Sequence, residues 1–250
     1  MYLRLIPMIV YDFSFSSPGE NLACDEALLD WREETAGPDI LRFWQSANPF
    51  IVVGYANSIS TEVNVANCRA QAIPILRRCS GGGTVLQGPG CLNYALVLNI
   101  AAHPNLAGIS TANRFIMQQN RAAIQAALRN LSSEIAVRGH TDLAIGDRKF
   151  SGNSQRRRKH YLLFHGTFLL HFDLKAVADL LRMPSRQPDY RSSRSHADFL
   201  ANLNAGAAEI KNALKKIWAA DHPLADPPLE KIARLAGEKY GRREWNFKFQ

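Results

Sequence analysis

The sequence predicts an α+β fold in which a mixed β-sheet is flanked by helices, with residues 1–250 forming a single domain. The chain is long enough, and at 46% hydrophobic content apolar enough, to bury a full core. Short β-rich runs alternate with segments of helical periodicity. No internal repeat or linker divides the chain, and no apolar run reaches the roughly 20 residues that a membrane-spanning helix needs.

The first part of the chain predicts one helix and three strands. Residues 1–15 hold an apolar patch around one arginine but no small-residue cleavage site, which favours a first strand over a signal peptide. Asn21–Arg32 has helical periodicity, and Asn21 can cap its start. Ile40–Trp44 and Phe50–Gly54 are β-rich runs separated by an Asn-Pro turn, and we expect them to pair.

The middle of the chain predicts three strands, a glycine loop and a long helix. Ile73–Arg78 enters the glycine cluster Ser80–Gly83, Thr84–Leu86 leaves it, and Tyr94–Leu98 follows a Gly-Pro-Gly turn. Apolar residues recur at helical spacing over residues 110–131, so we expect a long amphipathic helix there.

A hairpin and two more strands are expected next. Gly146-Asp147 is a hairpin signal between Asp142–Ile145 and Arg148–Gly152. The β-rich runs Tyr161–Phe164 and Thr167–Leu170 predict two further strands.

The remaining segments predict surface structure and two helices. Arg156–His160 is typical of a solvated basic turn, although it could also meet an acidic protein surface or phosphate. Arg182–His196 is polar and rich in arginine and proline, which indicates a surface crossing. We expect helices at Gly206–Ala220 and Pro228–Tyr240.

Charge and cysteine usage narrow the partners and the compartment. Thirty Lys and Arg against 22 Asp and Glu give a formal net charge of +8. This charge indicates an anionic partner, which could be a nucleic acid, a phosphorylated small molecule or an acidic protein surface. The four cysteines have neither metal-ligand spacing nor the density of a disulfide framework, as expected in a reducing compartment. We therefore expect a cytoplasmic protein outside the membrane.

The most informative segment is Arg77–Val85, with three consecutive glycines after a strand. Glycines there let the backbone approach a ligand that a Cβ would exclude, and a neighbouring arginine supplies charge for a carboxylate or phosphate. Three glycines alone are more often a glycine-rich hairpin bend. A Walker A loop is excluded, because no Gly-Lys-Ser/Thr follows at the required spacing.

A second group of polar residues lies downstream, around Asp142, Lys149 and His165. A lysine on a strand beside a small-residue turn is held rigidly and can direct its ammonium at a developing anion. Taken singly, such a lysine is more often a solvated hairpin residue, and such a histidine is more often structural.

Together these segments resemble the lipoate-protein ligase family, within the biotin and lipoate ligase superfamily. Its motifs appear in order as Arg77–Val85, Thr141–Leu143, Arg148–Arg156 and His165–Leu169. The helix at Asn21, the Glu-Val-Asn at residues 62–64 and the Glu-Trp-Asn-Phe at residues 244–247 are also similar. The resemblance spans nearly the whole chain and implies a biotin/lipoate ligase-like catalytic domain without a large C-terminal accessory domain.

The resemblance implies roles for individual residues. Lys149 matches the family's active-site lysine, which contacts the acyl carbonyl and the adenylate phosphate. Asp142 matches an aspartate near the adenylate, with a possible role in binding magnesium. The other implied lipoate- or adenylate-binding residues are Arg78, Ser80, Gly81, Gly82, Gly83, Thr84, Val85, Asn93, Ser151, Gly152, His165, Gly166 and Thr167.

The activity implied is that of an ATP-dependent lipoate-protein ligase. Since a carboxylate is a poor acyl donor to an amine, ATP and Mg²⁺ would convert lipoate to lipoyl-AMP. The lipoyl group would then pass to a lysine of an acidic carrier, such as a lipoyl domain, a glycine cleavage H-like protein or a lipoate-binding protein. Adenylation could also need a separate accessory subunit. A nucleic-acid-binding module is a weaker alternative, because no interleaved aromatics or recognised binding motif accompany the basic charge.

The sequence departs from the ligase pattern after the glycine loop. Gln87 stands where that pattern has histidine, and Cys91 stands where it has asparagine, although Asn93 is close enough to replace some polar contacts. The Gly-Pro-Gly between them is similar to that of octanoyltransferases of the superfamily, which use a cysteine thioester and no ATP. An octanoyl or lipoyl transferase, supplied by an acyl carrier protein or a preformed acyl-adenylate, is therefore the alternative. Against it, all four cysteines precede residue 92, away from the positions that those transferases use.

Overall fold

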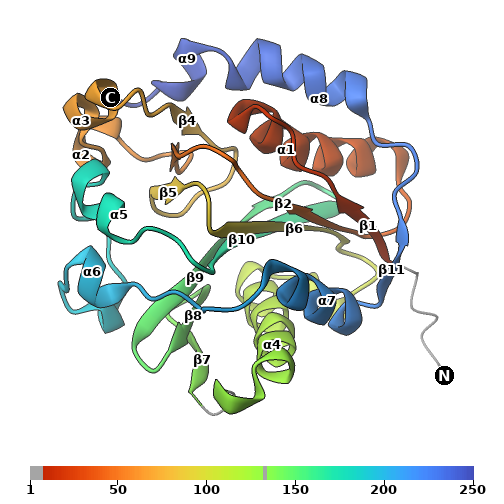
Figure 1. Cartoon of the computed structure of the whole chain (residues 1–250). Coiled ribbons are helices and arrows are strands. Elements are labelled where there is room, and N and C mark those ends of the chain that lie inside the picture. Colours follow the sequence, from red (N-terminus) through yellow and green to blue (C-terminus); the bar gives the residue numbers. More distant parts are fainter. Residues whose placement is uncertain (1–7, 132–133) are drawn as a thin grey trace.

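Two sheets form the centre of the molecule in the computed structural model, which describes residues 8–131 and 134–250 (Figure 1). Residues 1–7 of the expected first strand lie outside that range. The larger sheet has the strand order β11-β1-β2-β6-β10-β9-β8-β7. Its strands are β1 (Met8–Asp12), β2 (Ile40–Trp44), β6 (Cys91–Asn99), β7 (Ile135–Arg138), β8 (Asp142–Ile145), β9 (Arg148–Arg157), β10 (Tyr161–Leu169) and β11 (Ala220–Pro223).

The sheet is mixed, as the sequence predicts. β1 is parallel to both β2 and β11, and the other pairs are antiparallel. The central strands β6 and β10 read as nearly continuous apolar runs because both faces of the sheet are covered. β10 continues through His165-Gly166, which corrects the prediction of two strands there, since Gly166 pairs with residues on both neighbouring strands.

A smaller sheet contains β4 (Ile75–Arg77), β3 (Phe50–Val53) and β5 (Val85–Gln87) in that order. The expected pairing of Ile40–Trp44 with Phe50–Gly54 is wrong. Both edges of β2 are taken by β1 and β6, and the chain leaves β2 to start the second sheet.

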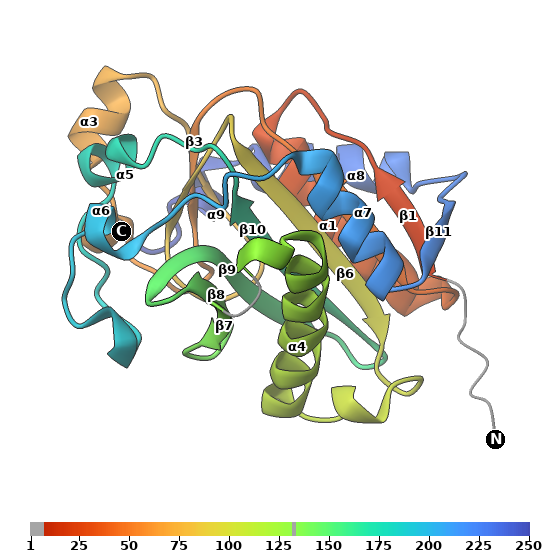
Figure 2. The ribbon, with the colours of Figure 1, turned by 60° about the horizontal axis from the view of Figure 1, so that its bottom comes forward.

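Helices cover both faces of the large sheet (Figures 1 and 2). On one face lie α4 (Ile109–Ala127) and α7 (Ala207–Ile217), and on the other lie α1 (Pro18–Thr35) and α8 (Leu229–Leu235). β6 shows the division, because Leu92, Tyr94 and Leu96 pack with α4 whereas Ala95 and Val97 pack with α1. The remaining short helices are α2 (Ile59–Glu62), α3 (Val65–Ala70), α5 (Lys175–Leu180), α6 (His196–Phe199) and α9 (Arg243–Asn246).

Two helix predictions change in detail. Asn21 does not cap α1, which begins at Pro18; its buried side chain instead bonds the backbone of Phe15 and the carbonyl of Ser17. The helix predicted at Pro228–Tyr240 is α8 followed by a π-helical turn at Ala236–Tyr240. No helix in the described ranges is long and apolar enough to cross a bilayer.

The segment predicted as a surface crossing, residues 182–196, is partly buried. Arg191 and His196 are each less than a tenth exposed, and Tyr190 contacts the large sheet. We call residues 182–196 the crossing segment. It is held at one end by Glu62, whose carboxylate accepts hydrogen bonds from the backbone N–H and the hydroxyl of Ser185. Near its other end, Arg194 forms an ion pair with Asp147 at 2.8 Å.

Candidate active site

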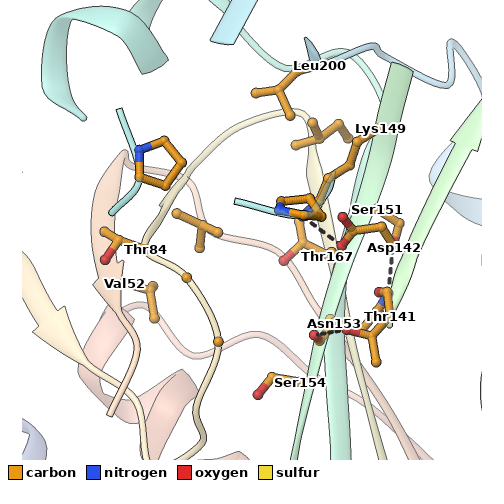
Figure 3. A pocket seen from close by; sticks show the side chains of 18 of the residues that line it. Val52, Thr84, Thr141, Asp142, Lys149, Ser151, Asn153, Ser154, Thr167 and Leu200 are labelled. Atoms are coloured by element: carbon orange, nitrogen blue, oxygen red, sulfur yellow. Dashed lines mark hydrogen bonds and ion pairs between the residues drawn. The ribbon is translucent and has the colours of Figure 1, made fainter. Parts of the chain in front are cut away.

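A cavity of about 1090 Å³ separates the two sheets where the crossing segment passes over them. Figure 3 shows Lys149, Asp142, Ser151 and Thr167 on one side of it and Val52 and Thr84 on the other. The two motifs that the sequence places about 65 residues apart, in the glycine loop and the β8–β9 hairpin, thus face one another.

One row of directly paired residues crosses four strands of the large sheet at this cavity. Asn93 on β6 pairs with Thr167 on β10, Thr167 pairs with Gly152 on β9, and Gly152 pairs with Asp142 on β8. Directly opposite residues point to the same face with Cβ atoms about 5 Å apart. Strand register therefore gathers residues from four distant parts of the sequence.

A β-bulge brings Lys149 onto the same face of the sheet as this row. Leu143 pairs with Ser151 but Ala144 pairs with Lys149, which leaves Phe150 as the extra residue. Lys149 consequently lies on the same face as Gly152, three residues later. A Cβ on Gly152 would lie 2.7 Å from Lys149 Cε and Nζ, so any other residue there would move the end of the lysine side chain from this position.

Asp142 is held from two sides. Lys149 Nζ lies 2.8 Å from Asp142 Oδ1, and the Tyr190 hydroxyl donates to Asp142 Oδ2 at 2.8 Å. Burial, reinforced by the Asp142 carboxylate, raises the pKa of Tyr190, so the phenol stays protonated and remains a donor. The Lys149 side chain keeps 24% exposure to the cavity, and its remaining ammonium protons are available to a ligand.

The glycine loop is shaped by Arg78. Its guanidinium donates to the carbonyls of Gly81 and Gly83 at 2.5 and 2.7 Å and to Ser80 Oγ at 3.2 Å. Gly82 has φ +84° and its carbonyl lies 2.0 Å from where a Cβ on Gly54 would be, so both positions require glycine. Burial lowers the pKa of Arg78 to about 10. Arg78 thus lines the cavity with Nε and Nη2 occupied by the loop and with Nη1 donating to the Val52 carbonyl at 3.4 Å.

A buried chain of polar residues lies two residues along β10 from Thr167. Asp25 on α1 accepts from Arg42 and, at 2.9 Å, from His165 Nδ1, while His165 Nε2 lies 2.6 Å from Ser80 Oγ. We call Arg42, Asp25, His165 and Ser80 the buried ion chain. It has the order of a Ser-His-Asp triad, but Ser80 is 1% exposed and does not line the cavity. The buried ion chain therefore holds the glycine loop against the large sheet, through the contact between Ser80 and His165.

Hydrogen bonds among Gln87, Thr167 and Asn93 lie at the β6 end of the row. Gln87 Nε2 donates to Thr167 Oγ1 at 2.5 Å, and Thr167 Oγ1 donates to Asn93 Oδ1 at 2.6 Å. Gln87, which replaces the histidine of the ligase pattern, therefore joins the small sheet to the row. On the opposite face, Asn153 lies over Gly166 and bonds both Tyr94 and the backbone of Thr141.

None of the four cysteines lines the cavity. All four are buried, and burial raises the pKa of Cys24, Cys79 and Cys91 to about 12 and raises that of Cys68. Cys91, the nucleophile considered in the sequence, is fully buried at the start of β6 among apolar side chains. A thiol in such surroundings is inert, because the thiolate is the nucleophile.

Most of the residues expected in the site meet at the cavity. Ser80 and Gly81 do not line it; the lining residues among those predicted are Arg78, Gly82, Gly83, Thr84, Val85, Asn93, Asp142, Lys149, Ser151, Gly152, His165, Gly166 and Thr167. Sequence reasoning missed Asp25 and Tyr190. Asp25 carried a usable signal, an acid between Leu22 and Leu28 in the segment that resembles the family's N-terminal helix, whereas Tyr190 carried none.

Asp142 is the carboxylate best placed for the expected magnesium. Across residues 8–131 and 134–250, no group of three or more His, Cys, Asp or Glu side chains forms a metal cage. Magnesium bound to substrate phosphates needs only one or two protein carboxylates. Each Asp142 oxygen has a second lone pair beyond the one used by Lys149 or Tyr190, so Asp142 fits this type of binding.

Comparison with known proteins identifies a family of lipoyl and octanoyl transfer enzymes. A family model described as "Lipoyl protein ligase A/B catalytic domain" matches residues 17–217. Octanoyltransferase LipM of Halalkalibacterium halodurans is 26% identical over 264 residues, covering 92% of this chain and 95% of its own length. Lipoate–protein ligase 1 of Staphylococcus aureus is 28% identical over 246 residues, covering 94% of this chain and 71% of its own length.

A solved structure shares the fold. A chain from the structure titled as a bi-partite lipoate protein ligase and its E2 lipoyl domain, from Thermoplasma acidophilum, has a TM-score of 0.79 at 21% identity, and 98% of each chain is covered. The named relatives are enzymes of octanoyl and lipoyl transfer, and their names favour the transferase alternative over the ATP-dependent ligase. Because the family model covers well over half of the sequence, the chain belongs to the lipoyl protein ligase A/B catalytic domain family.

Proposed function

We propose that the protein transfers an octanoyl or lipoyl group from an activated donor directly to a lysine of an acidic carrier domain, without an acyl-enzyme intermediate. The observation that carries the proposal is a cavity that holds the Lys149 ammonium and no thiol. The octanoyltransferase relatives support acyl transfer from a donor that is already activated. The buried cysteines argue against the thioester route.

The chemistry needs charge stabilisation more than a protein nucleophile. The neutral carrier amine attacks the acyl carbonyl, and negative charge develops on the carbonyl oxygen. The leaving group departs with the electron pair of its bond to the acyl carbon, and the proton that the amine nitrogen loses passes to solvent. Lys149, fixed over Gly152 by the bulge, places a cation where that charge develops. The ion pair with Asp142 holds the ammonium in position until the substrate arrives.

An acyl-adenylate is the donor that this site suits best. Its acyl phosphate brings a good leaving group, so an enzyme thioester is unnecessary. Lys149 can contact the carbonyl and phosphate together, and the open space beside Gly83 gives a ligand access to the loop backbone.

Formation of the adenylate in the same cavity is the second candidate. It is favoured by Asp142, which would hold a magnesium ion bound to ATP phosphates. That ion would neutralise phosphate charge when bound. This activity would make the protein an ATP-dependent ligase, with or without an accessory subunit.

The proposed partner is an acidic lipoyl-type carrier domain. The net charge of +8 suits electrostatic steering of such a domain. The archaeal structure with the same fold is titled as a ligase with its E2 lipoyl domain, which supports the same class of partner here.

One assay with three donors tests these readings. A lipoyl domain is incubated with octanoyl-acyl carrier protein, with preformed octanoyl-AMP, or with octanoate, ATP and Mg²⁺, and its acylation is followed by mass spectrometry. Transfer from octanoyl-AMP that persists in Cys91→Ala supports the proposal. Acylation with ATP and Mg²⁺ adds the ligase activity. Transfer only from octanoyl-acyl carrier protein, abolished in Cys91→Ala, would overturn direct transfer.

A further inference from the structure

Tyr190 is the only residue of the crossing segment whose side chain bonds the Lys149–Asp142 pair among the described residues. Its hydroxyl donates to Asp142 Oδ2 at 2.8 Å, while Lys149 Nζ forms an ion pair with Asp142 Oδ1 at 2.8 Å. The carboxylate is therefore fixed by two donors that come from segments about 40 residues apart. Fixing Asp142 also fixes the ammonium that it holds.

The crossing segment is seated on the sheet at Tyr190. A Cβ on Gly139 would lie 3.4 Å from Pro188 Cβ and 3.6 Å from the Tyr190 ring, which shows how closely the segment passes over the turn before β8. The Tyr190 ring also packs on Phe199, with centroids 5.2 Å apart. Elsewhere the segment is held by polar contacts to Glu62 and Asp147. The position of Tyr190 thus depends on the whole segment.

We propose that Tyr190 is a positioning residue that acts through Asp142, so that the crossing segment, in the place where the structure shows it, sets the orientation of Lys149 for acyl transfer. The inference rests on the proposed function. Thermodynamic linkage makes this coupling reciprocal, so that a contact which fixes Asp142 also stabilises the crossing segment in its place over the sheet.

Tyr190→Phe removes the hydroxyl and keeps the ring that packs on Phe199. We expect the single-turnover rate of transfer from octanoyl-AMP to fall about tenfold, with KM for octanoyl-AMP changed less than threefold. A loss of one hydrogen bond of this kind is worth about a factor of ten. Tyr11→Phe is the matched control, because it removes a phenol from β1, outside the cavity lining, and should leave the rate unchanged.

A double-mutant cycle separates positioning from a general structural effect. If Tyr190 acts through Asp142, Tyr190→Phe should lower the rate about tenfold in the parent protein and less than twofold in Asp142→Asn. Equal effects of Tyr190→Phe in both backgrounds would overturn the inference. If the parent protein transfers nothing from octanoyl-AMP, the proposed function fails instead, so the two failures are distinguishable.

Trypsin offers a second measurement that does not depend on activity. The crossing segment contains Arg182, Arg186, Arg191 and Arg194. Both Tyr190→Phe and Asp142→Asn should speed native-state cleavage within residues 182–194 by about the same factor, and the double variant should be no faster than either. Unchanged cleavage in both single variants would contradict the proposed coupling.

Discussion

The glycine loop and the β8–β9 hairpin each bring one cation to the cavity, and the two cations are held in opposite ways. Arg78 is buried, and each nitrogen of its guanidinium donates to the protein, Nε and Nη2 to its own loop and Nη1 to the Val52 carbonyl. Lys149 has one carboxylate partner and a side chain that is 24% exposed. We therefore expect Arg78 to build the site and Lys149 to contact the ligand. Hydrogen-bond saturation distinguishes them.

Lys149→Ala should have the largest effect and should act on catalysis. We expect the single-turnover transfer rate to fall at least about 1000-fold, or about 4 kcal/mol of transition-state stabilisation. The free energy of unfolding should change by less than about 1 kcal/mol, because the ion pair is partly exposed. Lys216→Ala, on an exposed position of α7, is the control. A rate within tenfold of the parent would contradict the catalytic role of Lys149.

Arg78→Met should reverse this pattern. Removing the guanidinium takes a donor from the carbonyls of Gly83 and Val52 and leaves that of Gly81 with Ser154 alone, and losing such hydrogen bonds together costs about 1–3 kcal/mol. We expect the free energy of unfolding, measured with urea, to fall by about 3 kcal/mol. An unchanged stability with a lost affinity for octanoyl-AMP would show that Arg78 binds ligand instead.

Gly82→Ala tests the loop backbone with a smaller change. Gly82 has φ +84°, and an added Cβ would lie 3.0 Å from the Arg78 guanidinium. We expect stability to fall by about 1–2 kcal/mol. Gly81→Ala is the matched control, because a Cβ there meets no atom within 4 Å. Equal losses from both variants would mean that the neighbouring glycines share the same constraint.

Thiol chemistry should have no effect on transfer at neutral pH. With the pKa of Cys79 and Cys91 raised to about 12, the thiolate fraction at pH 8 is on the order of 10⁻⁴. Iodoacetamide should therefore leave the rate within twofold of untreated protein at pH 8, and alkylation should increase only as pH approaches 12. Rapid inactivation at pH 8 would revive the thioester route.

The sequence by itself determined the family, the mixed sheet and most of the residues that line the candidate site. Ordered motifs identified Lys149, Asp142 and the glycine loop, because local patterns such as the Gly-Asp hairpin and the triple glycine specify local backbone shape. They also showed that Gln87 departs from the ligase pattern, and the structure places it on the cavity. Local pattern failed at β2 and β3, which are adjacent in sequence but belong to different sheets.

Only the tertiary structure decided which of these residues share a cavity and what each one contacts. The row from Asn93 to Asp142 depends on strand register, and the position of Lys149 depends on a bulge that shifts that register by one residue. The saturation of Arg78, the burial of Cys91 and the contact of Tyr190 with Asp142 join distant segments. Such contacts arise from long-range packing, which leaves no periodic signal in the sequence around any one of them.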